Sequence, residues 1–433
     1  MDTTSAISTW TALIRQFFAV FTVPGAEIFL ALVTGWVLCT GRHTITGILP
    51  FADPVGQHAH DAFHRFLPDA RWEMDALWKL LTVLLVQTFA ASGVIALDLD
   101  DTLFHRCGRK VCGAGWWRDA VRSTRTHTVS AWGLNLVVLT LRVTPPWGGE
   151  PLGLPILMRL HRKGGDSLLA LAEAMLQQVA GWLPERTFRL HADGFYAPLA
   201  GRGLVRVHVV SRMRRDAVLY EPLPTSGRRK GQRGRPRTRG RRLSAPQQMA
   251  RRVHSWRSVT TVERGQVRKR LLYARRVLWY HVCKTPVLLV ISRDPEGKEH
   301  DDFFFTTDVS LTPAQVIGGF AGRWSIEDTF KNTKQFVGGQ EPQTWKGPGP
   351  ERAAMLSLWL SSVVWLWYLS EEGRSGKVRI LPWYPQKVHP SFQDALARLR
   401  RHLWSQRIIA MFGKRFGHDK KTEVLLEALS RAA

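Results

Sequence analysis

Three aspartates stand together at positions 98, 100 and 101, at the end of a run of apolar residues in the sequence VIALDLDDTLF. The apolar run predicts a buried strand that brings these acids to one edge of a sheet. Two chemistries fit the pattern. In one, Asp98 attacks phosphorus and Asp100 protonates the leaving group. In the other, Asp100 holds a divalent cation with support from Thr102. The strand alone leaves both chemistries open.

A further acid ends a second apolar segment, because Asp193 closes the strand-like sequence TFRLHAD and precedes Gly194. Phosphodiester chemistry with two cations about 3.5–4 Å apart needs carboxylate oxygens from several elements. Asp193 is a candidate ligand of this kind. An Asp-Gly turn that caps the next helix explains the same two residues.

The late sequence FAGRWSIEDTFKNTKQFVGGQ predicts a helix over residues 320–340. At about 100° per residue, Arg323, Glu327 and Lys334 fall within about 40° of one another on one narrow face. The alternative is an ordinary surface ion pair between Arg323 and Glu327, one helical turn apart. The neighbouring aromatic Trp324 favours a face that is not simply exposed.

The formal net charge of +26 predicts a polyanionic partner, and nucleic acid is the first candidate. Residues 228–242 carry nine Lys or Arg and no acid, so this segment cannot bury a core of its own. Within it, Arg233, Arg235 and Arg237 form a sequence similar to an AT-hook, which lies in a narrow minor groove. Nonspecific contact with phosphates is the open alternative.

Only four cysteines are present, which favours a reducing compartment, and the first residues lack the basic region of a secretory signal. Residues 353–369 are uncharged and near the lower limit of a membrane span. Their serines favour a buried helix instead.

The elements expected to position the acids change character along the chain. Residues 1–90 predict helices, and the segment after residue 94 predicts strands with a helix at 166–183 between them, which indicates an α/β core. Strands are predicted at 94–99, 134–143, 187–193, 204–212, 258–263, 276–282, 286–293 and 302–307.

The DLDDT sequence resembles the first motif of haloacid dehalogenase-like phosphatases, which would use Asp98 and Asp100. That family also needs a later strand that ends in paired acids, whereas Asp301 and Asp302 precede an apolar run. The high positive charge is also unexplained by hydrolysis of a small phosphoester. This phosphatase is retained as an alternative.

The late helix resembles the Y-R-E-K signature of DDE transposases from bacterial insertion sequences, with phenylalanine in place of the usual tyrosine. The resemblance covers residues from about 95 to 343, and includes DDT at 100–102 and ADGFYA at 192–197 as the first two carboxylate motifs. The residues that match the late signature are Phe320, Arg323, Glu327 and Lys334.

The resemblance implies a ribonuclease H-like core, interrupted by a basic, strand-rich insertion and preceded by a helical N-terminal domain. It implies that Asp100, Asp193 and Glu327 are catalytic and hold two Mg²⁺ ions, with Mn²⁺ able to substitute. Cleavage and strand transfer would then proceed without a covalent protein intermediate. Arg323 and Lys334 would contact DNA phosphates.

The domains expected on this basis are a DNA-binding N-terminal region (1–90), two parts of the catalytic core (91–215 and 311–370), the insertion (216–310) and a basic C-terminal tail (371–433). The expected partner is double-stranded DNA, as transposon ends and target, in the bacterial cytoplasm at the nucleoid. A homodimer is expected on DNA, bridged by the basic run and by residues 398–407, both of which are expected to offer charge without a core. A DNA-binding protein whose active site has decayed is a further alternative.

Overall fold

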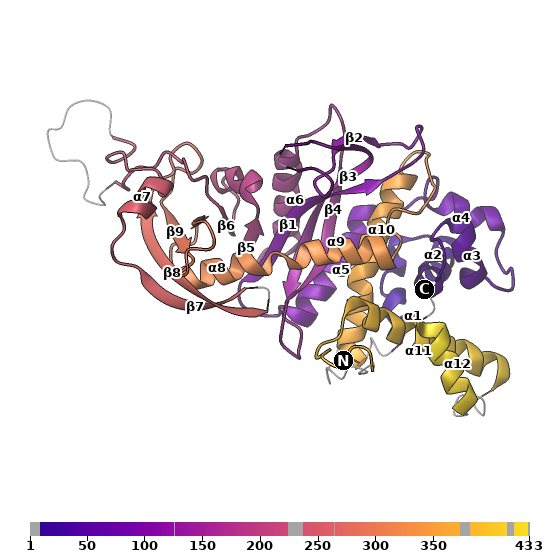
Figure 1. Cartoon of the computed structure of the whole chain (residues 1–433). Coiled ribbons are helices and arrows are strands. Elements are labelled where there is room, and N and C mark those ends of the chain that lie inside the picture. Colours follow the sequence, from indigo (N-terminus) through magenta and orange to yellow (C-terminus); the bar gives the residue numbers. More distant parts are fainter. Residues whose placement is uncertain are drawn as a thin grey trace.

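The protein has a mixed α/β fold built around one large sheet (Figure 1). The computed structural model describes residues 9–124, 126–223, 237–263, 265–372, 382–413 and 420–431. The strands are β1 (Ile95–His105), β2 (Gly115–Arg118), β3 (Ser130–Val143), β4 (Leu152–His161), β5 (Phe188–Ala192), β6 (Val207–Arg212), β7 (Arg257–Glu263), β8 (Gln266–Val277), β9 (Val287–Arg293) and β10 (Asp302–Thr306). The α-helices are α1 (Trp10–Arg15), α2 (Val23–Leu38), α3 (Ile45–Ala52), α4 (His60–Phe66), α5 (Met74–Phe89), α6 (Leu168–Trp182), α7 (Pro246–Arg252), α8 (Pro313–Gly322), α9 (Ser325–Phe336), α10 (Gly349–Trp367), α11 (Phe392–Phe412) and α12 (Lys420–Arg431).

The centre of the sheet is formed by three parallel strands, β1, β5 and β6. On one side β3 pairs antiparallel with β1 and carries both β2 and β4. On the other side β10, β9, β8 and β7 follow β6, all antiparallel. The order is consistent with the expected ribonuclease H-like core. The strands of the predicted insertion continue the sheet that carries the acids.

One predicted strand is wrong. Residues 276–282 were expected to form it, but β8 lies earlier in the chain and leaves the sheet after Val277. Trp279 instead packs edge-on against Phe305, with 5.2 Å between the ring centroids. Strand β8 was not predicted at its true position, because the cations at its exposed positions resemble those of a surface loop. Strands β2 and β4 were also missed.

The predicted N-terminal helices are present as α1 to α5, and they share one hydrophobic core with the sheet and α10. Helix α10 confirms the prediction of a buried apolar helix. Its length and composition would allow it to span a membrane, and its apolar window, within residues 349–370, is entirely buried inside the structure. The helical region therefore belongs to the same packed body as the sheet.

The expectation that residues 398–407 lack a core is wrong. They lie in α11, where Arg400 is buried and donates to the carbonyls of Val37 (2.7 Å) and Cys39 (2.8 Å) at the end of α2. Arg401 pairs with Glu427 of α12 at 3.0 Å. Arg400 thus satisfies carbonyls at a helix end, which lack intrahelical donors, and Arg401 pairs with a carboxylate of the same chain.

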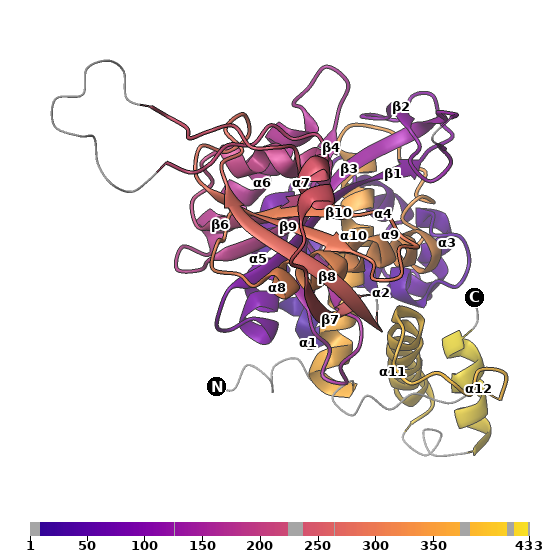
Figure 2. The ribbon, with the colours of Figure 1, turned by 60° about the vertical axis from the view of Figure 1, so that its left-hand side comes forward.

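The predicted helix over residues 320–340 is present as two helices, α8 and α9, joined at Arg323 and Trp324. Both junction residues keep right-handed helical angles, but their N–H groups bond to the third residue before them rather than the fourth. This tightened turn resembles a 3₁₀ helix. The two helices consequently continue in nearly one line across the sheet, while β7 and β8 form a long hairpin that passes over α8 (Figure 2).

A buried ion pair connects the sheet to these two helices. Asp98 is completely buried and accepts two hydrogen bonds from the Arg142 guanidinium, one of them from Nε at 3.0 Å. Ser325 Oγ donates to the same carboxylate at 3.1 Å, and Arg142 Nη1 donates to the Gly319 carbonyl at 2.6 Å. Asp98 is therefore out of reach of any substrate, which contradicts its role as the nucleophile of a phosphatase.

Replacement of Asp98 by Asn should lower the free energy of unfolding by about 3–5 kcal/mol, because it leaves the Arg142 guanidinium buried without its counter-charge. Urea titration followed by tryptophan fluorescence measures the change. The matched control is Asp216→Asn, which breaks an exposed pair with Arg214 and should leave the unfolding midpoint unchanged. Equal stability of the two variants would contradict the structural role of Asp98.

Candidate active site

Asp100 and Asp193 lie side by side at the carboxyl edge of β5, where the longer strand β1 continues past them to His105. Strands β1 and β5 pair in register from Ile95 with Phe188 to Leu99 with Ala192. Continuing this register by one residue sets Asp100 beside Asp193, at the spacing of adjacent strands, about 4.8 Å. The aspartate pair predicted from two separate motifs is thus brought together by strand pairing.

Asp193 also has the structural role that the sequence left open. Its Oδ1 accepts a hydrogen bond from the backbone N–H of Phe195 at 2.9 Å, and so caps the short 3₁₀ helix η3 (Gly194–Gly201). This bond fixes the orientation of the carboxylate relative to the end of β5. The cap and the position beside Asp100 are compatible, since a carboxylate accepts several bonds.

Arg323 joins the predicted first and third acids. Its Nη1 donates to Asp100 Oδ2 at 2.6 Å, and its Nη2 donates to Glu327 Oε1 at 2.9 Å. The Arg323 side chain is largely buried, with 11% of its surface exposed. The tightened turn between α8 and α9 places Arg323 above the edge of the sheet. The surface ion pair considered from the sequence is therefore part of a partly buried triad.

Asp101 is a further acid of this edge that the sequence did not single out as a site residue. By strand alternation it faces away from Asp100, and it accepts a hydrogen bond from the Tyr196 hydroxyl at 3.1 Å. Asn135 of β3 also bonds to the Asp101 carboxylate. The sequence GFYAPLA contains the tyrosine that could have indicated this contact. Its hydrogen-bond partner could not be predicted, because it depends on how η3 folds beside the sheet.

Burial of this acid cluster changes its protonation. Burial raises the pKa of Asp100 to about 7 despite the opposing charge of Arg323, and Asp101 and Asp193 add to the increase. The pKa of Asp101 is also raised, first by burial. Burial and the same acids raise the pKa of Tyr196. Negative charge is thus concentrated at this edge beyond what Arg323 neutralises.

The donor chemistry fits a divalent cation, because carboxylate oxygens are the ligands that Mg²⁺ and Mn²⁺ prefer. A cation would also favour the charged form of Asp100, whose pKa is raised by burial first and then by Asp101 and Asp193. Within the described ranges, however, no group of three or more His, Cys, Asp or Glu side chains is arranged to hold one ion. The Arg323 guanidinium lies between two of the predicted ligands, so joint coordination by them requires it to move.

Lys334 is not brought to these acids. It lies seven positions after Glu327, about 10 Å further along α9. Its ammonium lies 5.7 Å from the centre of the Phe104 ring, and burial lowers its pKa. The single helical face predicted for Arg323, Glu327 and Lys334 is real, but the helix is too long for one centre to use all three.

The predicted minor-groove arginines are only partly described. Arg237 is exposed at the first described position of the basic run, whereas Arg233 and Arg235 lie outside the described residues. Arg239, in the described part of the same run, lies over the Tyr220 ring at 4.5 Å and donates to the Tyr220 hydroxyl at 3.0 Å. The run thus joins the body of the protein through a defined contact.

We expect Asp100→Asn to stabilise the metal-free protein at about pH 8 by an amount on the order of 1–4 kcal/mol. Because the folded pKa of Asp100, about 7, lies above the unfolded value near 3.9, its stabilising contribution is complete below the unfolded pKa and is lost as pH rises through 7. The advantage of the variant should therefore shrink toward about pH 4.5. Thermal unfolding in chelator across this range measures it.

Asp328→Asn provides the control, since it removes an exposed acid from α9, the helix that carries Glu327. It should show no comparable gain at high pH. If Asp100→Asn proved less stable than the unmodified protein at about pH 8 in chelator, the account of uncompensated buried charge would be wrong.

Comparison with known families gives a match to the family described as DDE superfamily endonuclease, over residues 16–286. The match covers more than half of the 433 residues, includes Asp100 and Asp193, and ends before Glu327. A search of curated proteins gives no significant match. The match agrees with the paired aspartates at the edge of the mixed sheet. On these grounds, the chain belongs to the DDE superfamily endonuclease family.

Proposed function

We propose that this protein is a DNA transposase that performs metal-dependent phosphodiester cleavage and strand transfer for a bacterial insertion sequence. The observation that carries the proposal is the meeting of Asp100 and Asp193 through strand register, with Glu327 linked to Asp100 through Arg323. Membership of the endonuclease family supports nuclease chemistry at these acids.

In this proposal, Asp100, Asp193 and Glu327 would hold two Mg²⁺ ions, and the ions would supply Lewis-acid chemistry to activate an oxygen nucleophile and to stabilise the leaving oxygen. The side chains of the protein position the scissile phosphate. Arg323, once released from the carboxylates, donates its planar fork to the oxygens of the scissile phosphate. Tyr196 holds Asp101 on the opposite side of β1. No protein nucleophile takes part.

The proposed partner is double-stranded DNA, as element ends and target. The net charge of +26 supports a polyanionic partner. Further contacts would come from Lys334, from the N-terminal helices, and from Arg233, Arg235 and Arg237 of the basic run. These roles place the protein at the bacterial nucleoid.

A homodimer is proposed only on DNA. One active site holds one scissile phosphate at a time, so two ends of an element need two protomers. Repulsion between two chains of +26 charge opposes pairing until DNA neutralises it. Of the two bridges first considered, the basic run remains, because Arg400 and Arg401 of α11 are engaged by the end of α2 and by α12 of their own chain.

The test is cleavage of duplexes taken from the DNA that flanks the reading frame, with Mg²⁺ supplied. Asp100→Ala, Asp193→Ala and Glu327→Ala should each reduce cleavage by about 100-fold or more, since each removes a ligand of the reacting centre. Gel separation of labelled strands gives the rates. The exposed neighbour variant Asp328→Asn should cleave like the unmodified protein.

A DNA-binding protein with a decayed active site predicts a different result. It would bind the duplexes in a salt-sensitive way and show no cleavage with either Mg²⁺ or Mn²⁺. Cleavage that persists at full rate in all three alanine variants would instead reject these acids as the centre.

A further inference from the structure

A cavity of about 640 Å³ opens beside the candidate active site. Asp193 and Arg323 line it together with residues of β6, β7, β8 and β10. Strands β6 and β8 contribute three cations, Arg212, Arg268 and Arg270. A DNA strand bound at Asp193 and Arg323 could therefore continue into this arginine-lined cavity.

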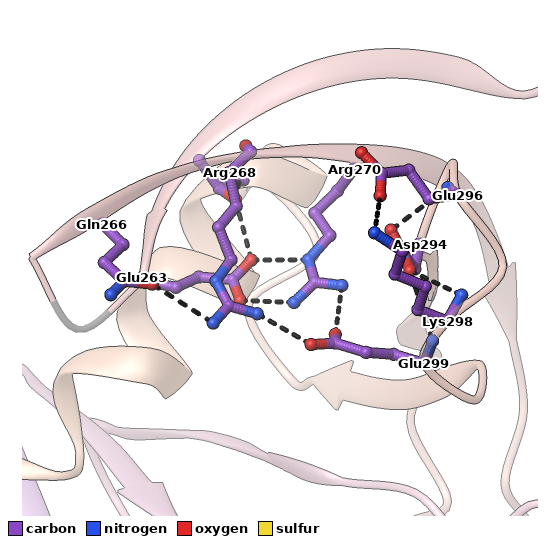
Figure 3. Close-up of polar contacts among 9 residues, drawn as sticks. Glu263, Gln266, Arg268, Arg270, Asp294, Glu296, Lys298 and Glu299 are labelled. Carbon is purple, nitrogen blue, oxygen red and sulfur yellow. Dashed lines mark hydrogen bonds and ion pairs between the residues drawn. The ribbon is translucent and has the colours of Figure 1, made fainter.

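Two of these arginines are held by carboxylates of the same cavity (Figure 3). Arg270 makes a two-pronged pair with Glu263, at 2.9 Å and 2.7 Å, and a third bond to Glu299 at 2.6 Å. Arg268 donates to the other oxygen of Glu299 at 2.8 Å. Glu299 thus bridges both guanidinium groups.

The two carboxylates differ in how firmly they are held. Glu263 and Arg270 are both largely buried, with 15% and 10% of their side chains exposed, whereas Glu299 and Arg268 are 47% and 40% exposed. Ion pairs between half-exposed groups are weak, because water competes for both partners. The bond between Arg268 and Glu299 is therefore the one that an incoming anion can replace.

Glu299 is carried by a turn whose backbone is fixed. The Asp294 side chain accepts hydrogen bonds from the N–H groups of Glu296, Lys298 and Glu299, at 3.2, 2.8 and 3.2 Å. Glu296 pairs with Lys298 and does not line the cavity. The turn therefore offers two glutamates in similar backbone surroundings, only one of which faces the arginines.

Arg212 of β6 is the third cation that lines the cavity. Its guanidinium carbon is 5.9 Å from the centre of the Phe304 ring and 5.5 Å from that of Phe320, and it pairs with Asp302 at 3.4 Å. Its side chain is about half exposed. The aromatic rings fix the plane of the guanidinium while its N–H groups stay available at the cavity edge.

We propose that this cavity binds backbone phosphates of the DNA strand that runs on from the scissile bond, with Arg268 and Arg212 as the phosphate contacts. Glu299 occupies the place of a phosphate until the strand enters, and Arg270 stays paired with Glu263. A guanidinium binds carboxylate and phosphate with the same fork of donors, so one acceptor replaces the other without rearrangement of the arginine. The inference rests on the proposed function.

The test measures binding of the full chain to a fluorescent duplex with a single-stranded extension, in Ca²⁺ to prevent cleavage. Glu299→Gln should tighten binding about two- to fivefold, because it removes the competing carboxylate. Glu296→Gln changes the charge equally on the same turn and should have less than half that effect. Arg268→Ala should reduce the slope of log Kd against log salt by about 0.7–0.9. Lys269→Ala, an exposed neighbour outside the cavity, should reduce it less.

Unfolding midpoints of all four variants establish that each is folded. Equal effects within either matched pair would overturn the inference, as would competition by inorganic phosphate at constant ionic strength, which would indicate a site for a free anion. If the unmodified protein bound no DNA, the proposed function itself would fail. DNA binding and cleavage with equal effects in the matched pairs would reject only the strand site.

Discussion

The buried pair of Asp98 and Arg142 is the contact on which the placement of the candidate active site depends. Asp98 precedes Asp100 by two residues and shares its face of β1, so whatever fixes Asp98 also fixes the height of Asp100. Arg142 and Ser325 connect that point to α8 and α9. Burying two charges requires a large desolvation free energy, so we infer that the pair serves mainly to specify how the helices lie on the sheet.

The sequence predicted much of this arrangement because Asp100 and Asp193 each follow a run of mostly apolar residues, although β1 continues beyond Asp100 to His105. Asp100 and Asp193 could be placed at a common edge from two motifs, and the pairing of Arg323 with Glu327 follows from helical spacing alone. The third contact of that triad could not be predicted. It depends on how α8 rests on the sheet, and nothing within residues 320–340 encodes the position of Asp100.

The errors have a shared physical origin in charged residues that the fold buries or half-buries. The basic strand β8 was misplaced because its arginines find their carboxylate partners on other segments, namely Glu263 of β7, Glu299 of a distant turn and Glu221. Arg400 was assigned to a basic tail because its partners are backbone carbonyls at the end of α2, and such distant backbone partners cannot be recognised in the sequence. Ion pairs and hydrogen bonds between distant residues produce no periodic pattern in the sequence, whereas burial of apolar side chains does.

The junction of the N-terminal helices with the end of the chain affects how the protein can fold during synthesis. The Trp36 indole donates to the carbonyl of Val337, which is 301 positions later, and Arg400 closes the end of α2 from 363 positions away. The first helices consequently leave the ribosome long before the segments that cover them. Contacts between residues so far apart in the sequence slow folding, and the apolar surface of the first helices stays exposed until they form. A prematurely terminated chain would keep these helices uncovered, so aggregation or degradation is its expected fate.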